Sequence, residues 1–474
     1  MPSLPTVPSP TPPSLWSDTT RRVVSGIAIL VVAAIGFGVG YLVFGGNDDE
    51  SAPSTVVVKG NDETPAIAFP TFATRNTTRI GGPDATADAA AVALASYPTG
   101  GGVDGPSAVV LAPVESWQEA LAATPLVADP VGAPILLSEP DAVPAITTEA
   151  LDALKPRGLS GAQGAQVVTI GKVAAPTDLV SLPIEGINET AIADQVDSQM
   201  TKLTGEKDPG ALLVVSSTDA PYAMPAASWA ARSGDPILFA DGDDVPANTL
   251  AVVKRHADTP IYVLGPESVI SNKALKTLGK DGGTVTRVGA EDPVENAITF
   301  ARYVDGDFGW NINDPGHGFT IANTDRPLDA AAAAPLAATG GTPGPMLLTD
   351  DPDKVPDALR SFLMDTQPGY VEDPSRAVFN RIWILGDESA ISVGFQAQVD
   401  ELTRLAPVKG SEADTIPEDT SGDTGSGESG DTTSTDGDTT STDDGDTTSS
   451  DDTTSSDGGD TTSDDSGSGS GRAP

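Results

Sequence analysis

The chain has 474 residues, carries a formal net charge of −42 and contains no cysteine. The absence of cysteine excludes disulfides, thiolate nucleophiles and cysteine-ligated zinc. Binding of nucleic acid by counterion release needs a basic surface, and the sequence has no basic cluster, so we expect no nucleic acid among its partners.

The first 22 residues form a proline-rich segment, which excludes a helix or a packed core there. Leu15 and Trp16 are its strongest apolar anchor. Two interpretations follow: the segment is a linear motif that binds a cytosolic protein partner, or it is a solvated stub.

Residues 23–44 form an apolar stretch without a charge. At about 1.5 Å per residue, a helix of this length crosses roughly 30 Å of hydrocarbon. Arg21 and Arg22 precede the stretch and the acidic residues 48–50 follow it, so the positive-inside rule predicts a cytosolic N-terminus and an extracellular C-terminus. The alternative is a cleaved signal peptide. A retained signal anchor in the cell membrane is favoured, because the stretch exceeds the usual apolar core of roughly 7–15 residues and no Ala-x-Ala site follows closely.

This topology predicts a protease result. Protease added to wall-stripped protoplasts should remove the chain after residue 44 and leave the first 20 residues protected, because only the part outside the membrane is accessible. Immunoblotting with antibodies to each end measures the outcome. Protection of residues 77–408 would contradict the extracellular assignment.

A short sequence motif, which we call the phrase, occurs three times. It consists of a proline, an apolar strand, acidic residues and then Val-Pro. The copies are residues 134–144, 236–246 and 345–356. Their first prolines lie 102 and 109 residues apart. This pitch is far above the roughly 20–50 residues of solenoid repeats, so each copy should belong to a small domain.

The same pattern of elements surrounds each phrase. The preceding strands are predicted at 108–111, 212–215 and 318–321, and the Ala-rich helices after them at 117–126, 222–229 and 327–336. A second helix follows the phrase, and the closing strands that end in glycine are 167–171, 261–265 and 382–386. The opening segments are 78–82, 182–186 and 286–290, each followed by an amphipathic stretch. Short apolar runs that alternate with helices predict an α/β fold of parallel sheets, covered on both faces and joined by right-handed crossovers.

These patterns divide the chain into seven parts. They are a cytosolic tail (1–22), a transmembrane helix (23–44), a linker (45–76), module 1 (77–180), module 2 (181–283), module 3 (284–408) and an acidic tail (409–474). Residues 411–474 hold 18 acidic residues and one arginine among Thr, Ser and Gly. This composition is too polar to offset the entropy of ordering, so we expect a disordered, extended tail.

Three segments of module 1 resemble motifs of the cell wall binding repeat 2 family. They are Arg79-Ile-Gly-Gly82, Trp117-Gln-Glu-Ala-Leu-Ala-Ala123 and Pro134-Ile-Leu-Leu-Ser138. The resemblance covers about residues 77–406. It implies three modules around a pseudo-threefold axis, in a Gram-positive envelope, that bind a secondary cell-wall polymer. The middle copy departs most, because it lacks the opening arginine and has Ala240 where the family shows threonine.

Ligands of parallel α/β sheets lie beyond the carboxyl ends of the strands. The binding residues predicted on this ground are Ser138, Glu139 and Gly171 in module 1, Asp241 and Gly265 in module 2, and Thr349, Asp350 and Gly386 in module 3. Hydroxyls and loop amides at such ends suit an anionic or polyol cell-wall polymer. The alternative is that these residues only build the strand and cap the next helix.

An enzyme is not expected, nor a cofactor or a metal. The two histidines, His256 at the exposed end of a predicted helix and His317 in a loop, have no partner at metal-binding spacing. No Gly-x-Ser-x-Gly elbow follows a strand. Acidic pairs such as 243–244 and 350–351 have the chemistry of glycosidase carboxylates, but their recurrence at one module position favours a solvated loop.

The sequence therefore predicts a membrane-anchored, non-enzymatic envelope protein whose three extracellular modules bind a cell-wall polymer. The alternative is a single-pass receptor or scaffold. Its N-terminal tail would link a cytosolic partner, for example of the division or envelope-growth machinery, to the envelope.

Overall fold

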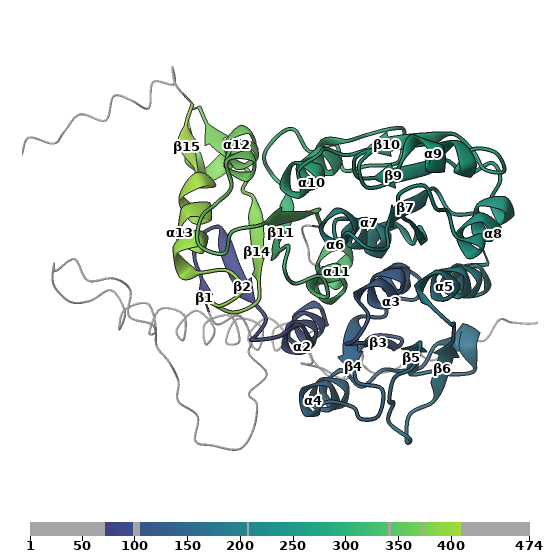
Figure 1. Cartoon of the computed structure of the whole chain (residues 1–474). Helices are drawn as coiled ribbons and strands as arrows, with labels where there is room; N and C mark the ends of the chain where they lie inside the picture. The colour runs from purple at the N-terminus through teal and green to yellow at the C-terminus, as the bar shows by residue number, and fades with distance from the viewer. Residues whose placement is uncertain (1–71, 98–104, 206–207, 340–342, 372, 409–474) are drawn as a thin grey trace, which may run out of the picture. The chain divides into compact units, whose positions relative to one another are not determined.

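The computed structural model describes residues 72–97, 105–205, 208–339, 343–371 and 373–408 (Figure 1). Leu15, Trp16, the predicted span 23–44 and the acidic tail lie outside the described residues. Within the described ranges, no helix is long and apolar enough to cross a membrane.

Three sheets each contain four parallel strands, and these strands have the same order in each sheet. The first contains β4 (Ile135–Ser138), β3 (Val109–Pro113), β5 (Val167–Ile170) and β6 (Ser181–Ile184). The second contains β8 (Ile237–Ala240), β7 (Leu212–Ser216), β9 (Ile261–Leu264) and β10 (Val285–Val288). The third contains β12 (Met346–Thr349), β11 (Gly318–Asn323), β14 (Arg381–Leu385) and β2 (Thr77–Ile80). The prediction of an α/β fold built from several small parallel sheets is confirmed.

Three further short strands lie outside this repeated pattern. β1 (Phe72–Ala73) extends the third sheet antiparallel to β2. β13 (Gly369–Tyr370) and β15 (Ala406–Pro407) form a separate parallel pair.

The fourth strand of each sheet comes from the next repeat of the sequence. β6 and β10, which open the second and third repeats, pair with β5 and β9 of the repeats before them. β2, which opens the first repeat, pairs with β14 of the third, with Thr77 beside Ile382. The strand pairing therefore links the three sheets in a closed cycle.

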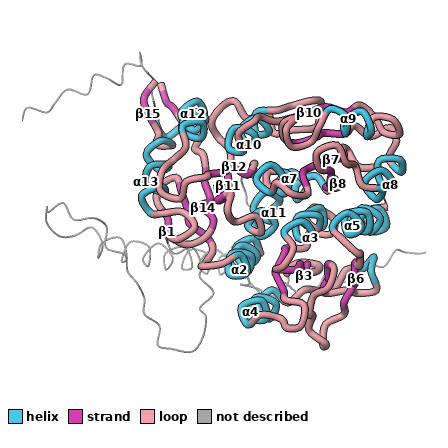
Figure 2. Tube along the Cα trace, in the orientation of Figure 1, coloured by secondary structure: helices cyan, strands magenta, loops and turns pink. Residues whose placement is uncertain are grey.

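Helices connect the strands in each repeat (Figure 2). They are α2 (Ala85–Ser96), α3 (Trp117–Ala122), α4 (Ala145–Leu154), α5 (Glu189–Thr204), α6 (Ala220–Ala223), α7 (Ala226–Ser233), α8 (Ala247–Arg255), α9 (Asn272–Leu278), α10 (Pro293–Arg302), α11 (Asp329–Thr339), α12 (Asp357–Asp365) and α13 (Val393–Leu402), with the 3₁₀ turns η1 (Thr124–Val127), η2 (Ser160–Ala162) and η3 (Pro374–Arg376). The second and third repeats place α9 and α13 after their closing strands, whereas residues 172–180 of the first repeat form no helix.

The Ala-rich helices supply the contacts between repeats. α11 packs against α2 and α7, and α7 packs against η1. Ala330, Ala331, Ala332, Ala333 and Ala334 of α11 are each at most 2% exposed. Because alanine adds only one methyl group, neighbouring helices can approach α11 closely and pack at the density of a protein interior.

Candidate binding site at the strand ends

The two predicted hydroxyls lie at strand ends, and both side chains are fully buried. Ser138 Oγ donates to the carbonyl of Ala174 at 2.9 Å, and Thr349 Oγ1 donates to the carbonyl of Asp351 at 2.7 Å. Both hydroxyls therefore hold a neighbouring loop. Ala240 occupies the same place in the second sheet without a hydroxyl and is also buried. Contact between these hydroxyls and a polymer stays a prediction.

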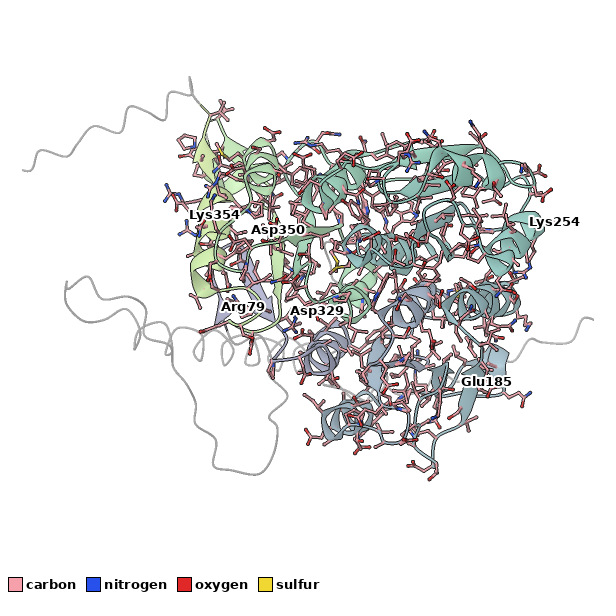
Figure 3. The ribbon with its side chains drawn as sticks, viewed as in Figure 1. Arg79, Glu185, Lys254, Asp329, Asp350 and Lys354 are labelled. Carbon is pink, nitrogen blue, oxygen red and sulfur yellow. The ribbon has the colours of Figure 1, made fainter. Side chains whose placement is uncertain are left out.

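The predicted acidic residues face solvent to different degrees. Glu139 and Asp350 are exposed, and Asp350 lies in the loop after β12 (Figure 3). Asp241 is half-buried, and its Oδ1 accepts a hydrogen bond from Thr218 Oγ1 at 2.8 Å. The strand ends thus present carboxylates that can accept hydrogen bonds from a ligand.

The three predicted glycines turn the chain at the end of each closing strand. Gly171, Gly265 and Gly386 have φ angles of +59°, +109° and +87°, a region that favours glycine. Their amides donate to the carbonyls of Ile184, Val288 and Ile80 at 2.9, 3.1 and 2.9 Å, each on the opening strand of the next repeat. We call these three places the 1/2 junction (Gly171), the 2/3 junction (Gly265) and the 3/1 junction (Gly386).

Arginines on the opening strands fasten two of the junctions. Arg79 of β2 is 3% exposed and donates to the carbonyls of Gly386 and Asp387 at 3.0 and 2.9 Å (Figure 3). Arg287 of β10 donates to the carbonyl of Gly265 at 2.8 Å. Pro183 holds the equivalent position in β6. The opening arginine is therefore missing from β6. This strand follows the first repeat, which has no helix after its closing strand.

A buried charged cluster closes the 3/1 junction. The side chains of Asp88 and Asp329 are fully buried, and that of Arg326 is 18% exposed. Arg326 forms ion pairs with Asp88 and, at 2.7 Å, with Asp329, while Asp88 Oδ1 accepts the amide of Gly82 at 2.5 Å. Burial, and then the charge of Asp329, raise the pKa of Asp88 to about 8. Burial also raises the pKa of Asp329. One cation therefore serves two buried carboxyl groups.

The 1/2 junction is built differently. Ile192, the residue equivalent to Asp88, is fully buried and apolar. Glu119, equivalent to Asp329, lies so close to Gly171 that a Cβ on this glycine would be 2.1 Å from Glu119 Oε2. Burial, and then the charge of Glu189, raise the pKa of Glu119.

The 2/3 junction combines an aromatic ring with a buried amide. Tyr222, equivalent to Asp329, lies beside Gly265, and its hydroxyl donates to the carbonyl of Glu291 at 2.5 Å. Asn296, equivalent to Asp88, is 1% exposed, and its side-chain oxygen and nitrogen have no hydrogen-bond partner among the described residues. Burial, and then Asp292, raise the pKa of Tyr222.

Sequence reasoning missed Tyr222 and Asn296. Aligning the opening segments on Gly82, Gly186 and Ala290 places Asp88, Ile192 and Asn296 six residues later in each copy. The residue type at this position differs between the three copies, although the segments around it repeat. This difference was the sequence signal that could have identified Asn296.

The expectation that His256 is exposed is wrong. The residue is 1% exposed, and its Nε2 and Nδ1 lie 3.1 and 3.0 Å from carboxylate oxygens of Asp197 and Asp208. Burial lowers the pKa of His256, but the hydrogen bonds to the two aspartates outweigh burial and raise it. Two carboxylates from outside its helix therefore make this buried position favourable. His317 pairs with Asp314 at 3.1 Å.

Residues 184–275 match the family model of cell wall binding domain 2. The resemblance inferred from the sequence is confirmed, and the matched segment lies in the second repeat, which lacks the opening arginine. No curated protein matches the chain.

Several solved structures share the fold, among them two proteins from Clostridium difficile. Cwp6 from Clostridium difficile is 18% identical, with a TM-score of 0.56 over 74% of this chain and 51% of that chain. Cwp8 from Clostridium difficile is 17% identical, with a TM-score of 0.54 over 70% of this chain and 52% of that chain. The chain thus spans about half the length of each of these structures.

Proposed function

We propose that this chain binds a cell-wall polymer through the carboxyl ends of its parallel strands. The match of residues 184–275 to the cell wall binding domain 2 family carries this proposal, and it supports a cell-wall-associated protein. The repetition of the same sheet and the same strand-end turn in three copies gives such a protein three related surfaces.

The charges at the strand ends favour a polyol over an anionic polymer. Glu139, Asp219 and Asp350 are exposed there. Carboxylates accept hydrogen bonds from hydroxyl groups, and such charge-assisted bonds are stronger than neutral ones. The same carboxylates repel phosphate or carboxylate groups of a ligand. A hydroxyl-rich, neutral portion of the polymer therefore fits these ends best.

Binding rather than catalysis is the proposed activity. Asp351 Oδ1 accepts the amides of Asp353 and Lys354 at 2.8 and 3.1 Å, so this carboxylate holds a turn. Asp243 binds Ser271 Oγ at 2.6 Å and Lys273 Nζ at 3.1 Å. These contacts favour the loop interpretation of the acidic pairs over glycosidase carboxylates.

Membrane anchoring forms a second part of the proposal. Its support is the uncharged stretch 23–44 with arginines before it and acidic residues after it. The anchor would hold the modules beside the wall, and the protease experiment on protoplasts described above tests it.

Sedimentation with isolated cell walls tests polymer binding. The purified full-length chain should sediment with intact walls, and at least tenfold less should sediment after the secondary polymer has been extracted. A hydroxyl-dominated interface should also persist at high salt, because screening acts mainly on exposed charges. Equal sedimentation with intact and extracted walls, or none with either, would overturn the proposed function.

A further inference from the structure

The side chain of Asn296 stands out among the buried polar groups. In the described part of the chain, the buried side-chain atoms without a hydrogen-bond partner belong to Ser96, Asn296, Trp310 and Trp383. In Asn296 both the acceptor oxygen and the donor nitrogen are unpartnered. A buried polar group without a partner is unfavourable for folding, so its retention calls for an explanation.

The equivalent positions of the other junctions are satisfied within the chain. Asp88 is bound by Gly82 and Arg326 at the 3/1 junction, and Ile192 has no polar group to satisfy at the 1/2 junction. The fold therefore accepts an apolar residue or a bonded carboxylate at this position. It does not require an unpartnered amide.

The amide is directed at the strand ends. A Cβ placed on Gly289 would lie 2.5 Å from Asn296 Oδ1 and 2.8 Å from the amide nitrogen of Gly265. Asn296 thus lies against the ends of β9 and β10, on the side where ligands of parallel sheets bind. The ring of Tyr222 lies against the same Gly265, with its Cγ and Cδ1 atoms 3.7 Å from a Cβ placed on this glycine.

The 3/1 junction shows what these two positions can hold. There the equivalent residues, Asp88 and Asp329, both bind the guanidinium of Arg326. By the strand register, which aligns Asn323 with Ser216, the residue equivalent to Arg326 is Asp219. Asp219 is exposed and its side chain is shorter. The 2/3 junction therefore lacks the internal group that links the two positions at the 3/1 junction.

We propose that the 2/3 junction binds one sugar or polyol unit of the wall polymer, with the amide of Asn296 and the ring of Tyr222 as its main contacts. This proposal rests on the proposed function. The amide offers a donor and an acceptor to neighbouring hydroxyls, and an aromatic ring packs against the apolar face of a sugar. Asp219 and Glu291 are exposed beside the ring and accept further hydroxyls. To admit the ligand, the ring moves away from its single hydrogen bond to the carbonyl of Glu291.

The test uses Asn296→Ile, which installs the residue of the 1/2 junction. In the full-length chain this variant should raise the melting temperature by roughly 2–4 °C, because it removes the unpartnered amide. It should also weaken binding to isolated walls about tenfold, as expected for the loss of one or two hydrogen bonds to the ligand. Tyr222→Ala should weaken binding to a similar extent. Arg404→Met, which changes an exposed residue outside the three junctions, is the control and should leave wall affinity within about twofold.

The outcomes separate this site from the proposed function. If the wild-type chain binds walls and Asn296→Ile binds equally well, the site is overturned while the function stands. A fall in the melting temperature of Asn296→Ile would also overturn the site, because it would mean that the amide stabilises the fold. Absence of wall binding by the wild-type chain would instead overturn the proposed function.

Discussion

Replacing Arg326 by methionine should lower the free energy of unfolding by about 3–5 kcal/mol at neutral pH. Arg326 pairs with Asp88 and Asp329, whose side chains are fully buried. Without the guanidinium, at least one buried carboxylate has no cation beside it or must take up a proton. Both alternatives disfavour the folded state. Since the cluster joins the first repeat to the third, the loss should weaken the closure of the cycle.

The matched control is Arg404→Met. Arg404 forms an exposed pair with Glu401 at 3.3 Å, and such surface pairs contribute about 0–1 kcal/mol. Urea unfolding of the full-length chain, followed by tryptophan fluorescence, measures both variants. Equal losses in the two variants would refute the importance assigned to the buried cluster.

Stability should fall as pH rises from about 4 to about 8. Asp88 has a folded pKa of about 8 against an ordinary value of 3.8, so between these pH values the folded state holds a proton that the unfolded state has lost. The stabilisation is therefore complete below pH 3.8 and is lost progressively up to the folded pKa. One pKa unit corresponds to about 1.4 kcal/mol, which makes the total effect on the order of a few kcal/mol. The raised pKa values of Asp235 and His256 act in the same direction.

Asp88→Asn isolates the contribution of this group. Asparagine keeps an acceptor for the amide of Gly82 and carries no charge, so the variant should be more stable than the wild type at pH 9. Its stability should also depend less on pH. Denaturation curves at pH 5, 7 and 9 provide the comparison. Wild-type stability that increases from pH 5 to pH 9 would contradict the assignment.

The repeated phrases predicted most of the secondary structure because short apolar runs between helices rarely fit anything but buried parallel strands. Strands β4, β8 and β12 begin directly after the first proline of each phrase, and α4, α8 and α12 begin directly after the last. No local sequence signal predicted that the opening strand of each repeat pairs with the closing strand of the repeat before it. β2 pairs with β14 about 300 residues away, and the pattern of a parallel strand does not identify its neighbour.

The candidate site was predicted less completely. Ser138 and Thr349 do end their strands, but the sequence does not show that their hydroxyls bond to loop carbonyls. The sequence could not show that the buried amide of Asn296 has no hydrogen-bond partner, because its possible partners are residues that different repeats bring together in the fold. The family resemblance led to the proposal of a cell-wall polymer as the ligand. The differences between the three junctions led to the proposal of a site at the 2/3 junction.

Hydrogen exchange of the full-length chain, with and without the extracted wall polymer, tests the central claim most directly. The account predicts slower exchange at the strand ends when polymer is present, with the largest change at residues 219–222, 265–268 and 289–296 of the 2/3 junction. Amides of η2, which precedes β5 and lies away from the strand ends, should exchange at unchanged rates. Unchanged exchange at every strand end under saturating polymer would contradict the claim that these ends bind the wall.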